Sequence, residues 1–194
     1  MPPLTQALII TNVVVFLLQQ LFGGAFTKMF ALWPLSSGLF MPWQLVSYAF
    51  LHGNLTHIAF NMFGIWMFGR ELEDLWGKQR LAVFFLASVL AAAALQLLVA
   101  STLGIMAPTI GASGGLFGLM LGFAMMFPRR TIVPLIPPIP MPAWLFVTLY
   151  GLVELTLGVT GSASGIAHFA HLGGLLGGWL VILYWRHQRP SGRW

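Results

Sequence analysis

Residues 111–128 read GASGGLFGLMLGFAMMFP, an apolar stretch without charged side chains in which a serine follows two small residues. Glycine then recurs at every fourth position, at Gly114, Gly118 and Gly122. Small residues at this spacing let two membrane helices approach each other backbone to backbone. The stretch therefore predicts a membrane helix that packs closely against a neighbour and carries Ser113 at its start.

The composition of the whole chain predicts that most of it faces lipid or other apolar helices. Charged residues make up 7% of the 194 residues, against about 25% in a typical soluble domain, and the mean hydropathy is +0.87. Six spans of about 20 residues fill a chain of this length. Cysteine is absent, which excludes disulfides and thiolate nucleophiles. We expect one all-α membrane domain over residues 1–194.

Apolar runs between polar residues or Pro/Gly breaks place the six spans. The runs cover residues 4–22, 55–69, 81–103, 113–128, 142–158 and 167–185. The long first loop, residues 23–51, is rich in Phe, Trp, Pro and Met, and we expect it to lie partly in the membrane interface. Residues 104–112 precede the serine helix as non-helical backbone, which a membrane tolerates only inside protein or beside a water-filled cavity. We therefore expect such a cavity.

Lysine and arginine fall almost entirely on one side of a six-span bundle, with Lys28 as the exception. The other eight are Arg70, Lys78, Arg80, Arg129, Arg130, Arg186, Arg189 and Arg193. Cytoplasmic loops carry the excess of such cations. We predict that both termini are cytoplasmic and that the chain lies in the inner (plasma) membrane of a cell. Because the cations form no aromatic-interleaved patch, we expect no nucleic-acid partner.

Three polar side chains fall at one depth of this predicted bundle. At 1.5 Å per residue, His57, Ser113 and His171 lie about 8–12 Å below the outer boundary of a hydrocarbon core about 30 Å thick. A polar group without a partner costs several kcal/mol there, so an intramembrane polar cluster marks a candidate functional site.

Glycine spacing predicts which two members of this cluster meet. Two spans carry small residues four positions apart: Gly114 and Gly118 on one, Gly174 and Gly178 on the other. Docking of these faces would bring Ser113 and His171 within hydrogen-bonding distance as nucleophile and general base. No Asp or Glu lies near this depth on the same spans, so we expect a Ser-His dyad.

His57 and Asn61 lie one turn apart and face the same point. With the backbone N–H of Ser113 at a helix start, they are expected to donate hydrogen bonds to a developing oxyanion. Taken without the serine and the base, the same pair is equally compatible with hydrogen bonding between helices.

The chain resembles the rhomboid intramembrane serine proteases, and the resemblance covers essentially all of it in their basic six-span form. Gly-x-Ser-Gly is present at Gly111–Gly114, Ala-His-x-x-Gly-x-x-x-Gly at Ala170–Gly178, and His-x-x-x-Asn at His57–Asn61. The resemblance implies a six-transmembrane-helix rhomboid bundle that hydrolyses peptide bonds in or next to transmembrane segments of other membrane proteins. We expect neither a cofactor nor a metal.

The resemblance also implies roles outside these motifs. Glu73 matches a structural acidic position, and Trp43 belongs to the membrane-lying first loop. The Trp-Arg pair often seen there is Trp43-Gln44 in this chain. The aromatic residue one turn after the serine is Phe117 where some members have tyrosine, which keeps a ring that can stack on His171.

Several interpretations stay open at this stage. His52 and His168 are expected to assist hydrogen bonding or hydration of the site. Glu154 on residues 142–158 suits a gating or proton role, or a side chain that reaches toward the interface.

Two other functions compete with proteolysis. A haem or metal protein would use His57 and His171 as ligands. This function would not explain the motif at Gly111–Gly114. A non-catalytic rhomboid-like protein would bind membrane helices without cutting them. The presence of both Ser113 and His171 argues against this second alternative.

Overall fold

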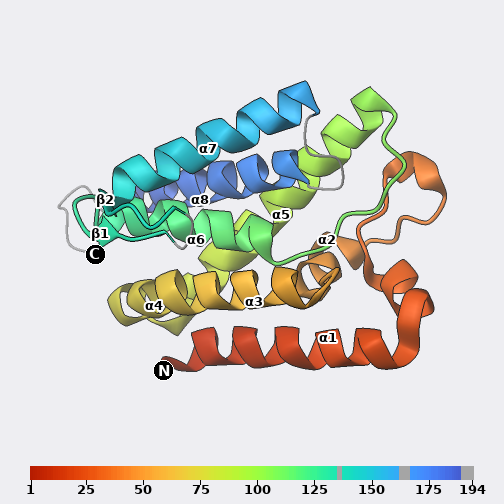
Figure 1. The fold of residues 1–194 in the computed structure, drawn as a ribbon, viewed down its shortest axis with the longest axis horizontal. Helices are drawn as coiled ribbons and strands as arrows, with labels where there is room; N and C mark the ends of the chain where they lie inside the picture. Colours follow the sequence, from red (N-terminus) through yellow and green to blue (C-terminus); the bar gives the residue numbers. More distant parts are fainter. Residues whose placement is uncertain (135–136, 162–166, 189–194) are drawn as a thin grey trace.

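The computed structural model describes residues 1–134, 137–161 and 167–188, which form a bundle of helices (Figure 1). The helices are α1 (Pro3–Phe30), α2 (Gln44–Ser47), α3 (Leu55–Gly64), α4 (Arg70–Trp76), α5 (Lys78–Leu103), α6 (Ser113–Met126), α7 (Ala143–Thr160) and α8 (His168–Gln188). Short helical turns are η1 (Leu35–Ser37) and η2 (Tyr48–Phe50), and the π-helical segment η3 (Ile65–Gly69) joins α3 to α4. Strands β1 (Thr131–Ile132) and β2 (Met141–Pro142) pair antiparallel.

Every predicted span coincides with helix, but the lengths differ from the expectation. Among the described helices, α1, α5 and α7 are long and apolar enough to cross a membrane, and α6 is a shorter apolar helix. The helix expected over 55–69 continues through η3 and α4 to Trp76. The chain is thus helical and apolar as predicted, while the number of crossings stays a proposal.

The first helix extends beyond its predicted end at residue 22. Gly23 has φ of +65° and interrupts the helical geometry, yet the chain continues as helix to Phe30. Gly23 takes this left-handed conformation at low cost because it has no Cβ. The first part of the expected loop, residues 24–30, is therefore helical.

The glycine faces of α6 and α8 meet as the spacing predicts. A Cβ on Gly174 would overlap the backbone carbonyl of Gly114, and one on Gly178 would lie 3.3 Å from the Cα of Gly118. The neighbouring Gly173 of α8 faces α5, where a Cβ would lie 2.7 Å from the carbonyl oxygen of Ala91. Helix α8 is therefore held by backbone contacts on two sides.

Glu73 joins the start of α1 to α4. Its carboxylate is buried and accepts hydrogen bonds from the backbone N–H groups of Leu4 (2.8 Å) and Thr5 (2.7 Å), and from the Thr5 hydroxyl (2.8 Å). These N–H groups have no partner within α1 because they belong to its first turn. Glu73 thus has the structural role that the resemblance implied.

Cations gather at the end of the bundle where α1 begins. Arg130 pairs with Glu71 at 2.9 Å, and the Arg80 guanidinium lies 5.7 Å from the ring centroid of Trp185. Lys28 lies at the opposite end of α1 (Figure 1). The predicted cations Arg189 and Arg193 lie outside the described residues.

Candidate active site

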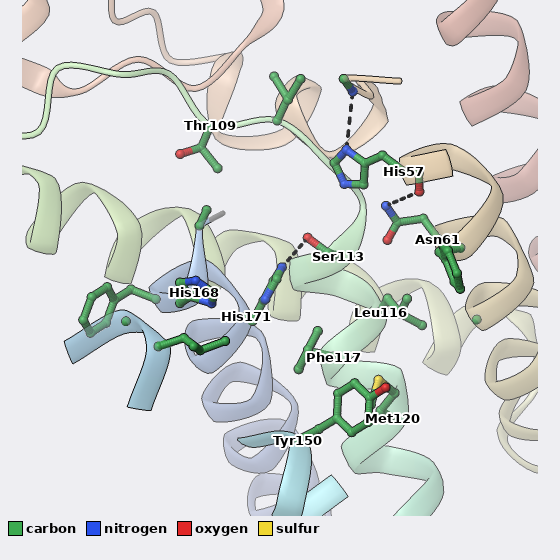
Figure 2. Close-up of a pocket in the computed structure, with 18 of the residues that line it drawn as sticks. His57, Asn61, Thr109, Ser113, Leu116, Phe117, Met120, Tyr150, His168 and His171 are labelled. Carbon is green, nitrogen blue, oxygen red and sulfur yellow. Dashed lines mark hydrogen bonds between the residues drawn. The ribbon is translucent and has the colours of Figure 1, made fainter. Parts of the chain in front are cut away.

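Ser113 and His171 are hydrogen-bonded partners from two helices. Helix α6 begins at Ser113, and His171 lies near the start of α8. The serine Oγ is 2.8 Å from Nε2 of His171 (Figure 2). The glycine faces of α6 and α8 thus place a hydroxyl and an imidazole in the geometry that general-base activation of a serine requires.

Phe117 fixes the plane of the His171 ring. The two rings are stacked with centroids 4.4 Å apart and an interplanar angle of 4°. Phe117 follows Ser113 by one turn of α6, so the same helix contacts both Nε2 and the face of the imidazole. The stacking expected for this phenylalanine is present.

An acidic side chain lies on the other edge of His171. Oε2 of Glu154, from α7, is 2.9 Å from Nδ1 of His171 and 2.6 Å from Nδ1 of His168. The expectation of a Ser-His dyad rested on the absence of Asp and Glu from the spans that carry the motifs. The carboxylate comes instead from α7, the fifth predicted span, which that argument did not consider.

In Figure 2, His57 lies on the other side of Ser113 from His171. Its Nδ1 accepts a hydrogen bond of 3.4 Å from the backbone N–H of Gly53, which places the ring proton of the neutral imidazole on Nε2. A Cβ built on Gly111 would lie 2.9 Å from His57 Nε2 and 3.5 Å from Ser113 Oγ. The Nε2–H donor and the serine oxygen thus flank the same spot.

Gly111 needs its lack of a side chain for two reasons. Its φ is +128°, which L-residues with a Cβ rarely adopt, and an added Cβ would press against the His57 ring. Its N–H donates to the backbone carbonyl of Tyr48 at 2.9 Å, which holds this turn in place.

Asn61 is buried one turn after His57 on α3. Its Nδ2 donates to the backbone carbonyl of His57 at 3.1 Å. An amide NH₂ carries two hydrogens, so one N–H remains beside this bond. This bond lies within α3 and is not a bond between helices, and the remaining N–H leaves Asn61 a donor for the proposed oxyanion role.

His52 supports His57 by ring packing. The two rings meet edge to face with centroids 5.0 Å apart and an interplanar angle of 71°. His52 is buried, and Gln19 of α1 accepts from its backbone N–H at 2.8 Å. Its two ring nitrogens have no hydrogen-bond partner among the described residues. Sequence reasoning identified His52 as an assisting residue but had no signal for this contact.

A cavity of about 1110 Å³ opens onto these side chains. Its lining includes His57, Ser113 and His171, together with Ile105 and Thr109 from the connection between α5 and α6. Thr109 exchanges backbone hydrogen bonds of 2.9 and 3.0 Å with Leu32 of the first loop, which anchors this non-helical segment. The cavity predicted beside residues 104–112 is present.

Gln44, the residue after Trp43, organises the first loop. It is buried; its Oε1 accepts from the backbone N–H of Trp33 at 3.2 Å, and its Nε2 donates to the backbone carbonyls of Met29 (3.2 Å) and Leu39 (3.0 Å). The neighbouring Trp43 donates to Met29 as well, at 3.1 Å. The neutral amide therefore ties the loop together without a charge.

Glu154, His168 and His171 are also a possible donor set for a metal ion. One ligand atom from each lies within 4.8 Å of the others. Tetrahedral zinc at 2.0–2.1 Å from its ligands separates them by about 3.3 Å. The observed separations of 2.6 and 2.9 Å from Oε2 to the two Nδ1 atoms are shorter and match direct hydrogen-bond or ion-pair contacts.

Comparison with known proteins places these features in a family. The Rhomboid domain model matches residues 39–188. Rhomboid protein 1, mitochondrial, of Saccharomyces cerevisiae is 30% identical over 169 residues, which cover 78% of this chain and 46% of that protein. Rhomboid protease GlpG of Serratia proteamaculans is 29% identical over 193 residues, covering 96% of this chain and 64% of that protein.

A shorter match agrees with these two. Rhomboid protease GlpG of Klebsiella pneumoniae is 35% identical over 89 residues, which cover 45% of this chain and 32% of that protein. The chain thus spans between about a third and two thirds of the length of these curated relatives.

Proposed function

The chain belongs to the rhomboid family, and we propose that it is an intramembrane serine endopeptidase that hydrolyses peptide bonds in or next to transmembrane segments of other membrane proteins. The observation that carries this proposal is the 2.8 Å contact between Ser113 Oγ and His171 Nε2 on the wall of a cavity. The names of the relatives, among them two rhomboid proteases, support the same activity.

The reaction proceeds through an acyl-enzyme. Nε2 of His171 takes the proton of Ser113 as Oγ attacks the scissile carbonyl, and the imidazolium then protonates the leaving amine. A water molecule next gives a proton to Nε2 and attacks the ester carbonyl. Expulsion of Oγ, which regains the proton, releases the carboxylic acid and restores the enzyme.

Donors around Ser113 stabilise the tetrahedral oxyanion. The Nε2–H of His57, the second N–H of Asn61 and the backbone N–H of Ser113 all belong to this wall of the cavity. The Ser113 N–H lies in the first turn of α6, where it has no partner within the helix. Removal of one such donor usually costs about 10²–10³ in rate.

The protein acts within a membrane, and its arrangement there is part of the proposal. Six spans form one domain over residues 1–194 in the inner (plasma) membrane of a cell, with both termini cytoplasmic. The cations at the end of the bundle where α1 begins support this orientation. The cavity then faces the outer side, where water enters.

Substrates are single transmembrane helices that enter between α3 and α7. At this side of the cavity the lining includes Phe68 of η3, which continues α3, and Phe146 of α7, whose ring centroids are 6.4 Å apart. A helix must unwind locally to expose a carbonyl. The free-energy cost of unwinding is lower in substrates that have Gly, Pro or polar residues near a small residue at the cleavage point.

Cleavage of membrane substrates tests the function directly. The purified protein in liposomes is incubated with a panel of tagged transmembrane segments, and the products are mapped by mass spectrometry. We expect cuts in or next to the apolar segment with wild type and none with Ser113→Ala, whose removed hydroxyl leaves the glycine face intact. Equal cleavage by both proteins would contradict the proposal. Binding of the same segments without any cleavage by wild type would favour the helix-binding alternative.

A further inference from the structure

Glu154 is a charged side chain on an otherwise uncharged helix. The sequence of α7, AWLFVTLYGLVELTLGVT, contains no other ionisable acid or base apart from a tyrosine. The Glu154 side chain is only 12% exposed. A carboxylate withdrawn from water needs charged or hydrogen-bonding partners, and those partners indicate what it does.

Among the described residues, the charged or hydrogen-bonding side chains that contact Glu154 are two imidazoles of α8. Its Oε2 lies 2.6 Å from Nδ1 of His168 and 2.9 Å from Nδ1 of His171. Nε2 of the same His171 ring is 2.8 Å from Ser113 Oγ. Serine, histidine and glutamate therefore form a continuous series of contacts from α6 through α8 to α7.

We propose that Glu154 is a positioning residue that orients His171 and selects its reactive tautomer, an inference that rests on the proposed protease function. An ionised carboxylate only accepts hydrogen bonds, so its presence favours the proton on Nδ1 of His171. Nε2 is then the unprotonated nitrogen that takes the proton of Ser113. Once His171 becomes an imidazolium, the negative charge 2.9 Å away stabilises it.

His168 holds the carboxylate in place. Its Nδ1 makes the shorter hydrogen bond to Oε2, and its side chain is 5% exposed. Because the carboxylate accepts, Nδ1 of His168 carries its ring proton. His168 thus restricts where Glu154 can point, although it does not touch the serine.

The contact to His171 is close but not fully aligned. Nδ1 of His171 meets no hydrogen-bond geometry with Oε2, although the two atoms are 2.9 Å apart. Catalytic hydrogen bonds are often poorly aligned without substrate and tighten in the reacting complex. A small rotation of the carboxylate completes the bond as charge develops on the ring.

Kinetics on membrane substrate tests this role. Glu154→Gln keeps the shape and removes the charge, and we expect kcat to fall by at least about 10²-fold with KM within about twofold of wild type. Glu154→Asp keeps the charge on a shorter side chain, and we expect it to retain more activity than the glutamine variant. Glu71→Gln, which alters an exposed pair with Arg130, is the control that leaves kcat unchanged.

His168→Ala separates positioning from simple tethering of α7. It breaks the bond to Glu154 but leaves the contact between Glu154 and His171, so we expect a smaller loss of kcat than in Glu154→Gln. Equal losses in the two variants, with matching losses of thermal stability, would overturn the proposal in favour of a tether. A KM effect with unchanged kcat would overturn it as well.

The tautomer of His171 supplies a readout that needs no substrate. NMR of protein with ¹⁵N-labelled histidine, assigned by comparison with His171→Asn, is expected to show the Nδ1-protonated form in wild type and a mixture in Glu154→Gln. An unchanged tautomer would contradict the role of Glu154. If wild type cleaves no segment, the proposed function fails. The NMR comparison of wild type with Glu154→Gln still tests whether Glu154 sets the tautomer of His171.

Treatment with a chelator distinguishes the positioning role of Glu154 from metal binding by Glu154, His168 and His171. Wild-type cleavage is measured after EDTA treatment and again with added zinc. We expect no change with EDTA. Loss of activity restored by zinc would assign the Glu154, His168 and His171 group to a metal ion and would overturn the positioning role.

Discussion

Two parts of the bundle that form the candidate site differ in how closely they are packed. One is the contact between α6 and α8, and the other is the outer helix α7. Ten of the 14 residues of α6 are buried, and its glycines meet those of α8 backbone to backbone. Only Ala143, Phe146 and Val147 are buried among the 18 residues of α7, all near its start. The nucleophile and base thus lie on a close backbone contact, whereas Glu154 reaches them from the second half of a helix whose buried residues all lie near its start.

This difference predicts different responses to mutation. On α6 and α8 the close packing leaves no room for added atoms, so small changes disrupt fold and activity together. At Gly151 of α7 an added Cβ meets ordinary van der Waals distances, and we expect the bundle to stay intact. Changes at Glu154 then alter the rate without altering the fold.

Gly174→Ala is the change with the largest expected effect. The new Cβ would overlap the carbonyl of Gly114, and backbone on both helices cannot move away independently. We expect cleavage to be lost and the Tm to fall. In the matched control Gly151→Ala on α7, the new Cβ would lie 3.4 Å from Leu175 Cδ1, and both quantities should stay near wild type. Equal behaviour of the two variants would contradict the comparison.

Removal of the base comes next. His171→Ala removes the imidazole that is hydrogen-bonded to Ser113 Oγ, and we expect kcat to fall by roughly 10³-fold or more. His168→Ala should retain measurable turnover because that ring contacts Glu154 and not the serine. Both rates are measured on one substrate with folding checked by Tm. The opposite ranking would transfer the base to His168.

The oxyanion donors should have intermediate effects. His57→Ala and Asn61→Ala are each expected to lower kcat by roughly 10–10³-fold with little change in KM. The donors act on one oxygen, so the double variant should lose less than the product of the single losses. Lowered Tm with normal kcat would instead assign the pair to helix packing.

Glu73→Gln should have the smallest effect on catalysis. Its carboxylate accepts three hydrogen bonds at the start of α1, far along the bundle from Ser113. Loss of the charge should lower the free energy of unfolding by about 1–3 kcal/mol with kcat unchanged. Urea or thermal unfolding in detergent measures the free energy of unfolding. A lower kcat of fully folded Glu73→Gln would contradict a purely structural role for Glu73.

Much of the fold follows from local composition. Apolar length locates the helices, and the four-residue glycine spacing identifies the faces of α6 and α8 that meet. The start of α6 at Ser113 and the cavity beside residues 104–112 also follow, because non-helical backbone needs a wet or buried setting. These features depend on residues near each other in the sequence.

The remaining features depend on contacts that periodicity does not encode. Helical spacing tells which residues share a face of α7 but not which neighbour that face meets, so the approach of Glu154 to His171 was missed. The edge-to-face packing of His52 on His57 has the same origin. The helix beyond Gly23 was missed because two adjacent glycines are typical of a loop.

Reaction with a fluorophosphonate tests most directly whether His171 activates Ser113. The probe labels a serine only when a base makes it nucleophilic, and mass spectrometry locates the modified residue without any substrate being known. We expect wild-type protein in detergent to be labelled at Ser113, and Ser113→Ala and His171→Ala to remain unlabelled while folded. Labelling of folded His171→Ala at the wild-type rate, or no labelling of folded wild type, would contradict the account.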